Sequence, residues 1–417
     1  MITHSPDMTR AIRARFAHVE SCPFQGPRIF FENAGGALTL KSVVDTSATF
    51  AAIPDNQGRD NPASAALVET IRKSKAEMAV FFNAPEGQFF VGESGTELLF
   101  RLIRTAVMGS ASGGKVLGST VEHPASRSAA QHWAELAGKP YVSVPHDDET
   151  GQVTPGAYAE RVTPDVRVAT ILHTSPVTGI ANDVAGIVRE IRAVAPDAYI
   201  IVDGIQHASH GRIDIASYEI DGYVVSPYKV FSRHGYGVAW TSDRLSGLSL
   251  EALKDGPLGN WEMGTRDTGA YATFSDVVKY FDWLGGEVSG ETAPRARIEA
   301  AGHAIHAHEK ELTDAMLHGT GNLPGLADLP GITILGGVDN PDREGLVCFA
   351  LADIPAAEIV ERLNAQGIRT HVRKADHYSG NVLTPLGLDA AVRVSLCHYN
   401  TLEEVRSLLA AMKKMVG

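Results

Sequence analysis

The stretch VDGIQHASHGRIDIASYEIDGYVVSPYKVFSRHGYG, residues 202–237, decides the fold of this chain. An apolar strand ends at Asp203, and a second strand, residues 222–226, ends just before the sequence Pro-Tyr-Lys at 227–229. Side chains at the carboxyl ends of parallel strands point into the ligand crevice of an open α/β sheet. We therefore expect Asp203 and Lys229 to meet at one edge of such a sheet.

Strands and helices alternate on both sides of this stretch. Short apolar runs predict strands at 88–92, 115–119, 169–173, 198–203, 222–226 and 237–241. Helical patterns lie between or before them, at 64–82, 96–108, 126–137 and 184–194. This alternation is typical of βαβ units, and it predicts a large α/β domain whose mostly parallel sheet is covered on both faces.

The pattern changes at about residue 286 of the 417. A predicted helix at 292–317 is followed by a Gly/Pro-rich piece, a strand at 345–351, a helix at 356–366, a strand at 393–396 and a closing helix at 401–414. These elements indicate a smaller α+β domain. We expect the large domain to cover residues 31–285, the small domain residues 286–417, and an N-terminal segment, residues 1–30, to pack with the small domain.

Composition and charge exclude several classes of protein. The 37 Lys and Arg residues against 49 Asp and Glu give a net charge of −12 without basic runs, which argues against nucleic acid and anionic membranes as partners. Cys22, Cys348 and Cys397 fit neither a disulfide framework nor a metal spacing, so we expect no metal and a reducing, cytoplasmic location. No apolar run reaches the ~18 residues of a transmembrane helix, and the N-terminal sequence resembles an amphipathic helix rather than a signal peptide.

A carboxylate and a lysine at one sheet edge suit pyridoxal phosphate as a cofactor. The lysine amine forms a Schiff base with the cofactor, and the carboxylate keeps the pyridine nitrogen protonated so that the ring can accept electrons. Taken alone, such a pair is more often a helix cap and a solvated surface lysine. The interpretation of Asp203 and Lys229 therefore depends on other segments.

Three further segments agree with a phosphate-bearing cofactor. GESGTELLF, residues 92–100, places Gly95 and Thr96 at a strand-to-helix junction, where free N–H groups and the helix dipole bind phosphate. VEHPAS, residues 121–126, places His123 after a strand, where its ring could lie flat on a cofactor. GTRDT, residues 264–268, offers a hydroxyl and amide cluster. The simpler alternatives are an N-cap, a core or solvated histidine and a loop turn.

Together these residues resemble the class V aminotransferase family of fold-type I pyridoxal-phosphate enzymes, in particular its cysteine desulfurase and selenocysteine lyase branch. The resemblance extends from FFENAGGA, residues 30–37, to RVSLCHYNTLEEV, residues 393–405. It implies a seven-stranded type of sheet in the large domain. It also implies that Lys229 is the Schiff-base lysine, that Asp203 pairs with the pyridinium nitrogen and that His123 stacks on the ring.

The same resemblance implies the remaining contacts to the cofactor. Gln206 bonds the phenolic oxygen. The phosphate is held by Gly95, Thr96, Ser226 and Tyr228, with Thr265 reaching in from the second subunit of a homodimer. Tyr228 stands where many desulfurases carry a histidine, so it keeps a hydroxyl for the phosphate but lacks an imidazole.

Two arginines are candidates for binding the carboxylate of a substrate. A guanidinium matches a planar acid with two parallel hydrogen bonds. By the resemblance, Arg393 is the expected clamp, and Arg373 is a second candidate. The alternative for Arg393 is an arginine that starts a strand and pairs with a neighbouring acid.

Two departures from the desulfurase pattern lie on the substrate side. Desulfurases carry a nucleophilic cysteine on a mobile loop before the clamp arginine, but the corresponding stretch VRKADHYSGNVL, residues 372–383, has none. A hydroxyl does not readily replace a thiolate as a sulfur acceptor, and we expect Cys397 to be a buried residue of a strand. Pro176, in HTSPVTG, occupies a position that is commonly an asparagine and brings no side-chain donor.

We therefore expect a pyridoxal-phosphate enzyme that acts on a small amino acid. Cleavage between Cβ and a heteroatom, as in desulfurase-like or selenocysteine lyase-like enzymes but without a loop cysteine, ranks first. Transamination or epimerisation at Cα ranks second, and Cα–Cβ cleavage third. A non-catalytic scaffold that binds the cofactor is a further alternative, although such a protein would be expected to lack Lys229 or Asp203. A nicotinamide-binding protein lacks support because no GxGxxG follows the early strands.

Overall fold

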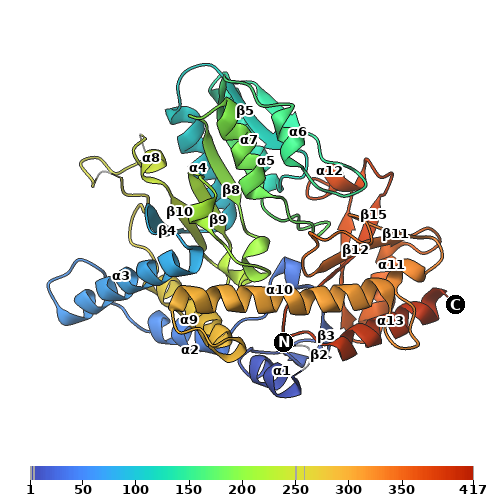
Figure 1. Cartoon of the computed structure of the whole chain (residues 1–417). Helices are drawn as coiled ribbons and strands as arrows, with labels where there is room; N and C mark the ends of the chain where they lie inside the picture. Colours follow the sequence, from blue (N-terminus) through green and yellow to red (C-terminus); the bar gives the residue numbers. More distant parts are fainter. Residues whose placement is uncertain (1, 3–4, 249–250, 258, 417) are drawn as a thin grey trace.

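The computed structural model describes residues 2, 5–248, 251–257 and 259–416, and its larger sheet has seven strands and lies in the upper part of Figure 1. All neighbouring strands of this sheet are parallel except for β10, which is antiparallel to both of its neighbours. The mostly parallel sheet that the sequence predicts is therefore confirmed. In sheet order the strands are β4 (Gln88–Gly92), β10 (Gly237–Thr241), β9 (Gly222–Val225), β8 (Tyr199–Asp203), β7 (Val166–Leu172), β5 (Lys115–Ser119) and β6 (Tyr141–Val144).

Helices pack against this sheet and against a second, four-stranded sheet. In chain order they are α1 (Pro6–Arg13), α2 (Lys41–Ala51), α3 (Pro62–Phe82), α4 (Gly95–Gly109), α5 (Pro124–Leu136), α6 (Pro155–Ala159), α7 (Val184–Val194), α8 (Asp243–Ser246), α9 (Thr268–Val288), α10 (Pro294–His318), α11 (Ala356–Ala365), α12 (Gly380–Leu383) and α13 (Leu402–Val416). Short 3-10 turns are η1 (Asn33–Gly35), η2 (His207–Ser209), η3 (Ile215–Ser217), η4 (Pro227–Lys229) and η5 (Leu326–Asp328).

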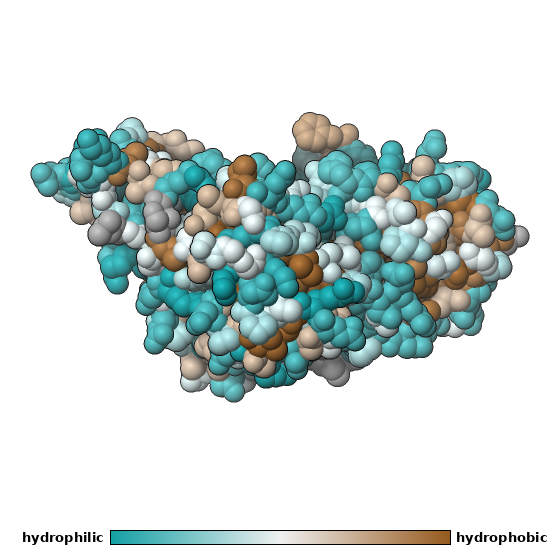
Figure 2. All heavy atoms as spheres, turned by 90° about the horizontal axis from the view of Figure 1, so that it is seen from above, coloured by the Kyte–Doolittle hydropathy of each residue, from teal (hydrophilic) through white to brown (hydrophobic). Residues whose placement is uncertain are grey.

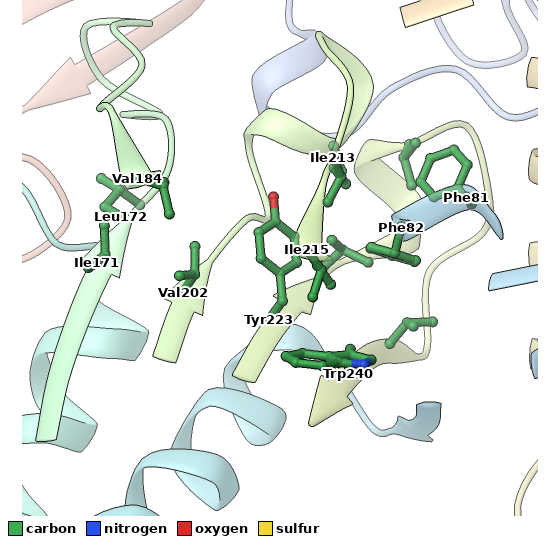
Figure 3. Packing of buried hydrophobic residues seen from close by; sticks show 14 of the residues in the cluster. Phe81, Phe82, Ile171, Leu172, Val184, Val202, Ile213, Ile215, Tyr223 and Trp240 are labelled. Carbon is green, nitrogen blue, oxygen red and sulfur yellow. The ribbon is translucent and has the colours of Figure 1, made fainter. Parts of the chain in front are cut away.

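Successive residues of the central strands face opposite sides of the sheet, and each side is apolar. Val202 and Tyr223 project to the same side as Phe81 and Phe82 of α3 (Figure 3). Ile201 and Val224, which are next to them in the chain, belong to the apolar cluster formed with α4 and α5 on the other side of the sheet. Because side chains alternate along a strand, continuous apolar runs such as these must be covered on both faces. This burial places Asp203, the last residue of β8, and Ser226, the residue after β9, at the same edge of the sheet.

The smaller sheet is antiparallel and has two different faces. Its strands, in sheet order, are β11 (Ile332–Ile334), β12 (Leu346–Leu351), β15 (Ala390–Ser395) and β14 (His371–Lys374). Val392 and Val394 face the apolar cluster that includes residues of α11 and α13. Arg393, between them, lies on the opposite face of the strand, opposite Cys348 of β12. Arg373 is paired with Ala391, so the sheet presents both arginines on one face.

The N-terminal segment contacts the C-terminal part of the chain. Arg13 at the end of α1 donates hydrogen bonds to the carbonyl oxygen of Tyr399 and to Glu404, at 2.6 and 3.1 Å. Strand β3 (Ile29–Phe30) pairs with β13 (Ile368–Arg369), whereas β1 (Ser21–Cys22) and β2 (Gly26–Pro27) pair with each other. Helix α10 runs from α9 towards the small sheet (Figure 1). The expected boundary at 285/286 falls inside α9, and the division into domains stays a prediction.

Two strand assignments from the sequence need correction. Strand β15 begins at Ala390 and ends at Ser395, so Arg393 lies inside the strand rather than at its start. Cys397 is buried as expected but lies beyond the strand, in a turn where its N–H donates to Oδ1 of Asn400 at 2.9 Å. Strand β6 was not anticipated, because its sequence YVSV is short and largely polar or partly exposed.

The surface seen from above is mainly hydrophilic, with apolar residues in small separate groups (Figure 2). Large apolar side chains that are exposed include Phe24, Leu136 and Leu253. Among the described helices, none combines the length and apolarity needed to cross a membrane.

Candidate active site

Lys229 is the centre of the site, on the turn η4 that follows strand β9. Its Nζ donates a hydrogen bond of 3.3 Å to Oε1 of Gln206. Loss of water around the amine lowers the pKa of Lys229 to about 8, and the positive charges of Arg393 and Arg373 act in the same direction, whereas Asp203 opposes them. The amine is therefore closer to its neutral, nucleophilic form than that of an ordinary lysine.

Asp203 ends strand β8 and is only 2% exposed. Its Oδ1 accepts a hydrogen bond of 3.1 Å from the N–H of Ile205. Burial raises the pKa of Asp203 to about 6, against the effects of this hydrogen bond and of Lys229. The described part of the chain offers this carboxylate no ion-pair partner within 4.0 Å, so a buried acceptor is available to a ligand.

Gly95, Ser226 and Tyr228 line a narrow part of the same site. A Cβ atom on Gly95 would lie 2.4 Å from Oγ of Ser226, so only glycine allows this approach. Gly95 begins helix α4, and Ser94 caps the helix by accepting from the N–H of Glu97. The first-turn N–H groups of Gly95 and of the exposed Thr96 stay available for an anion, as the helix geometry requires.

Tyr228 closes this side of the site. Its ring stacks on that of His234, with centroids 4.3 Å apart, and a Cβ on Gly36 would lie 3.3 Å from the Tyr228 ring. Tyr228 and Lys229 belong to the same short turn, so the packing of the tyrosine ring also orients the lysine.

His123 caps helix α5 and accepts a hydrogen bond of 3.2 Å at Nδ1 from the N–H of Ala125. Burial lowers the pKa of His123 to about 3, and the charges of Lys229, Arg373 and Arg127 add to the effect. The ring is therefore neutral at physiological pH. Its centroid lies 6.0 Å from that of Tyr378, on the loop after β14.

Arg393 and Arg373 approach Lys229 from the small sheet. Nη1 of Arg393 donates to the carbonyl oxygen of Pro176 at 2.9 Å, and the Nε atom of Arg393 is buried without a hydrogen-bond partner. Arg373 donates through Nε to Oγ of Ser379 at 2.8 Å. Within the described residues, neither guanidinium forms a salt bridge, because the nearby Glu32 binds Arg369 at 2.7 Å instead. Burial lowers the pKa of Arg393 to about 10.

Among the described residues, Thr265 forms no hydrogen bond or ion pair with the other predicted site residues. It is exposed, on the loop before α9, and lines a depression together with Phe50, Gln57 and Leu67. The neighbouring Arg266 forms an ion pair with Glu93, next to the start of α4.

The loop that follows β14 contains no thiol, and the described cysteines near the site are poor nucleophiles. Cys348 lies opposite Arg393 across the strand pair β12–β15 and is fully buried. Burial raises the pKa of the Cys348 thiol to about 12 and also raises that of Cys397. Both thiols are therefore protonated at neutral pH, and a thiol in this form does not attack sulfur.

Several buried titratable residues around the site are not predicted from the sequence. Glu122 accepts a hydrogen bond of 2.5 Å from Ser126, and burial raises its pKa to about 7, with the charge of Asp203 adding to the effect. His210 contacts Gln206 and pairs with Glu309, 99 residues away in the chain. The VEHPAS motif contains Glu122, but the pairing of residues this far apart leaves no mark in the local pattern.

Comparisons with known proteins find relatives that match nearly the whole chain. The model of a family described as "Aminotransferase class-V" matches residues 29–408. The chain is 24% identical to a probable cysteine desulfurase of Vibrio cholerae, covering 97% of this chain and 98% of that protein. It is 25% identical to a probable cysteine desulfurase of Mycolicibacterium paratuberculosis, of which it spans only 58%. The structure of a cysteine desulfurase from Thermococcus onnurineus has a TM-score of 0.80 at 20% identity, covering 93% of this chain and 94% of that one, and it shows a shared fold.

Proposed function

Because the chain belongs to the aminotransferase class-V family, we propose that it uses pyridoxal phosphate to break a bond between Cβ and a heteroatom in a small amino acid. Enzymes of this family depend on pyridoxal phosphate, and the chain is an enzyme of this kind. The bond that breaks and the residues that act are the proposal. One observation supports the proposal. The buried amine of Lys229 lies in the same site as the carboxylate of Asp203, which has no ion-pair partner, and as Arg393 and Arg373, which form no salt bridge among the described residues.

The residues of the site fit the cofactor. The space that a Cβ on Gly95 would fill lies between the start of α4 and Ser226, where backbone N–H groups and a hydroxyl can hold a phosphate. The buried carboxylate of Asp203 can receive the protonated pyridine nitrogen, which offsets the cost of its burial. The amide of Gln206 lies beside Lys229 and can bond the phenolic oxygen.

Each side chain has a distinct part in the chemistry. When bound, the cofactor withdraws electrons from the bonds at the substrate Cα and makes one of them labile. Lys229 holds the cofactor and, once released from it, moves the proton at Cα, because its amine is tethered close by and titrates near neutrality. His123 stays neutral and presents an aromatic face without a competing charge.

Arg393 orients the substrate by its carboxylate. The guanidinium is held from one side by the Pro176 carbonyl, and its buried Nε lacks a partner. A bidentate carboxylate would satisfy this buried donor. Arg373 lies on the same face of the sheet. Its Nε and Nη2 donate to Ser379, so Nη1 is the nitrogen that could bind a second polar group of the substrate.

The positions and protonation of the cysteines support release of the heteroatom product without a protein persulfide. The stretch 372–383 has Tyr378 and Ser379 where a cysteine would be needed, and Ser379 is fully buried against Arg373. Cys348 and Cys397 are protonated and buried. We therefore expect the leaving group to depart without attack by either of these two buried cysteines.

We also propose a homodimer in which Thr265 completes the phosphate site of the partner subunit. In support, Thr265 is exposed in its own chain, although the motif GTRDT resembles a phosphate contact. A cytoplasmic location fits the three cysteines, which are free thiols.

A panel of amino acids with different groups on Cβ tests the proposed reaction. The purified enzyme is loaded with pyridoxal phosphate, and the released heteroatom product is measured together with the three-carbon product. We expect sulfide or selenide release from the cysteine or selenocysteine substrate. A keto acid that retains the heteroatom would instead identify transamination, and a racemised substrate would identify epimerisation; either result as the main activity would contradict Cβ cleavage.

A further inference from the structure

Two buried Glu–His pairs join the loop after β8 to the C-terminal half of the chain. Nδ1 of His210 lies 2.7 Å from Oε2 of Glu309 on α10, and Nδ1 of His207 lies 2.6 Å from Oε1 of Glu344, before β12. All four side chains are buried. The two pairs therefore match in chemistry, in burial and in the parts of the chain that they connect.

Only one of the pairs reaches Lys229. Nε2 of His210 lies 3.2 Å from Nε2 of Gln206, whose Oε1 accepts from Lys229 at 3.3 Å. Nε2 of His207 instead lies 3.1 Å from the carbonyl oxygen of Arg212. A continuous chain of hydrogen bonds thus runs from Lys229 through Gln206 and His210 to Glu309, whereas the other pair ends at the backbone.

The donor-to-acceptor direction of these hydrogen bonds depends on which group carries a proton. An ammonium group only donates, so a charged Lys229 requires the oxygen of the Gln206 amide to face it. The amide nitrogen then faces His210, whose Nε2 must accept. His210 is neutral in this arrangement, and its single proton lies on Nδ1, directed at Glu309.

The opposite direction is equally consistent. A neutral Lys229 amine has a lone pair that accepts from the amide nitrogen of Gln206. With the amide turned over, its oxygen faces His210, which then donates from Nε2 and carries two protons beside the carboxylate of Glu309. The two arrangements hold the same number of protons, because the proton lost by Lys229 is matched by the one on His210.

We propose that His210 and Glu309 are positioning residues that set the direction of the Gln206 amide, with the Glu309 carboxylate favouring the arrangement in which Lys229 is a neutral amine. This inference rests on the proposed function, in which that amine holds the cofactor and moves a proton. The pair acts through Gln206 and touches neither cofactor nor substrate.

The electrostatics around the pair support this role. Burial would lower the pKa of His210, but the carboxylate of Glu309 outweighs it and the pKa is raised. Burial raises the pKa of Glu309 to about 7, and the charge of His210 and its hydrogen bond to Glu309 oppose this effect and favour the carboxylate. Other titratable groups that face the pair are Lys229, His306, Glu344, Cys397, His398 and Tyr399.

The substitutions Glu309→Gln and Glu344→Gln form a matched test. The measurement is the rate at which acetic anhydride labels Lys229 in the full-length chain freed of cofactor, followed by peptide mass spectrometry over a range of pH. Only the neutral amine reacts, so the midpoint reports the pKa of Lys229. Glu309→Gln should raise the midpoint by about one pH unit, which slows labelling at neutral pH about tenfold. Glu344→Gln should leave the midpoint close to that of the wild type, although both variants unfold at a lower temperature.

Two further variants separate positioning from packing. Glu309→Asp keeps the charge and should return the midpoint towards the wild-type value. His210→Gln cannot take up a proton and should raise the midpoint as Glu309→Gln does. Equal shifts in Glu309→Gln and Glu344→Gln, or no shift in Glu309→Gln, would overturn the proposal. Because labelling is measured without cofactor, an error in the assignment of Lys229 as the cofactor lysine would be detected separately, by the borohydride experiment described below.

Discussion

The carbonyl oxygen of Pro176 accepts a hydrogen bond of 2.9 Å from Nη1 of Arg393. Pro176 lies in the loop after β7 and Arg393 in β15, so this bond crosses from the large sheet to the small one. Proline brings no side-chain donor or acceptor to the site, but its backbone orients the arginine. A guanidinium fixed before the substrate arrives loses less conformational freedom on binding.

The assignment of Lys229 as the cofactor lysine predicts a specific covalent label. Borohydride reduction of the loaded enzyme should abolish the visible band and leave the mass of the cofactor on the peptide that contains Lys229. Lys229→Ala should show neither. Lys139→Ala is the matched control, because Lys139 is also buried but its amine donates to two backbone carbonyl oxygens, of Ala111 and Gly113. A label on any peptide other than that of Lys229 would contradict the assignment.

The thiols predict that no protein persulfide takes part in turnover. Changing Cys22, Cys348 and Cys397 to alanine together should leave the rate of product release largely intact. Cys348 is the most stringent case, because it lies opposite Arg393 yet has a pKa of about 12. Alkylation and mass spectrometry during turnover of cysteine would detect a persulfide. Its appearance on any of the three residues would show that the chain does use a sulfur acceptor of its own.

Local sequence was enough to predict most strands of the central sheet and the positions of Asp203 and Lys229 relative to it. The apolar runs before Asp203 and Ser226 must be buried on both faces, which places the residues after them at one sheet edge. Strand β6 escaped prediction because its burial depends on its neighbour β5 more than on its own side chains. The extent of β15 also depends on pairing, here with β12 and β14.

The buried Glu–His pairs could not have been predicted from local sequence. Glu309 and Glu344 lie 99 and 137 residues from their histidine partners, and only the packing of α10 and the loop before β12 against the loop after β8 brings them together. A buried carboxylate on a predicted helix, such as Glu309 on α10, interrupts the amphipathic pattern, and the local sequence does not show which residue it pairs with. The same limit applies to Thr265, whose proposed role depends on a second subunit.

Asp203 predicts a pH dependence of stability in the chain without cofactor. Burial raises its pKa from 3.8 to about 6, so the folded chain binds this proton more tightly than the unfolded chain. The stability linked to this proton is fully present below pH 3.8 and is lost as the pH rises through about 6. The loss is on the order of 3 kcal/mol.

Asp203→Asn should remove this dependence and raise the free energy of unfolding at neutral pH, while it weakens cofactor binding. Urea denaturation at acidic and neutral pH measures both effects. Asp221→Asn is the control, because Asp221 is equally buried but paired with Arg192 and Arg244, at 3.2 and 2.6 Å. That variant should be less stable than the wild type. If Asp203→Asn were destabilised to the same extent, the carboxylate would already have a partner in the folded chain.

Thr265 predicts a site shared between subunits. Sedimentation should give twice the chain mass, and Thr265→Ala should lose one hydrogen bond to a charged phosphate, about 1.5–3 kcal/mol, or ten- to a hundredfold in cofactor affinity. Hybrid dimers of Thr265→Ala and Lys229→Ala chains distinguish the two geometries. If Thr265 acts across the interface, the intact Lys229 meets an intact Thr265 and one site regains its affinity. If Thr265 acts within its own chain, no site of the hybrid dimer is complete. Sedimentation as a monomer that keeps cofactor and activity would contradict the proposed dimer.

Arg393 predicts how the enzyme distinguishes an amino acid from its amide or its decarboxylated analogue. Two charge-assisted hydrogen bonds to the substrate carboxylate contribute about 1.5–3 kcal/mol each, so Arg393→Ala should lose about one to two powers of ten in affinity for each bond. Arg393→Lys should recover only part of this loss, because an ammonium cannot reproduce the planar fork. The measurement compares the acid with its amide in the wild type and in both variants, with the cofactor spectrum as a check on loading. Arg343→Lys is the control, since Arg343 is equally buried but its guanidinium donates to backbone carbonyl oxygens, among them that of Thr178 at 2.9 Å. A preference for the acid that survives in Arg393→Ala would move the carboxylate site to Arg373, which lies on the same face of the small sheet and forms no salt bridge among the described residues.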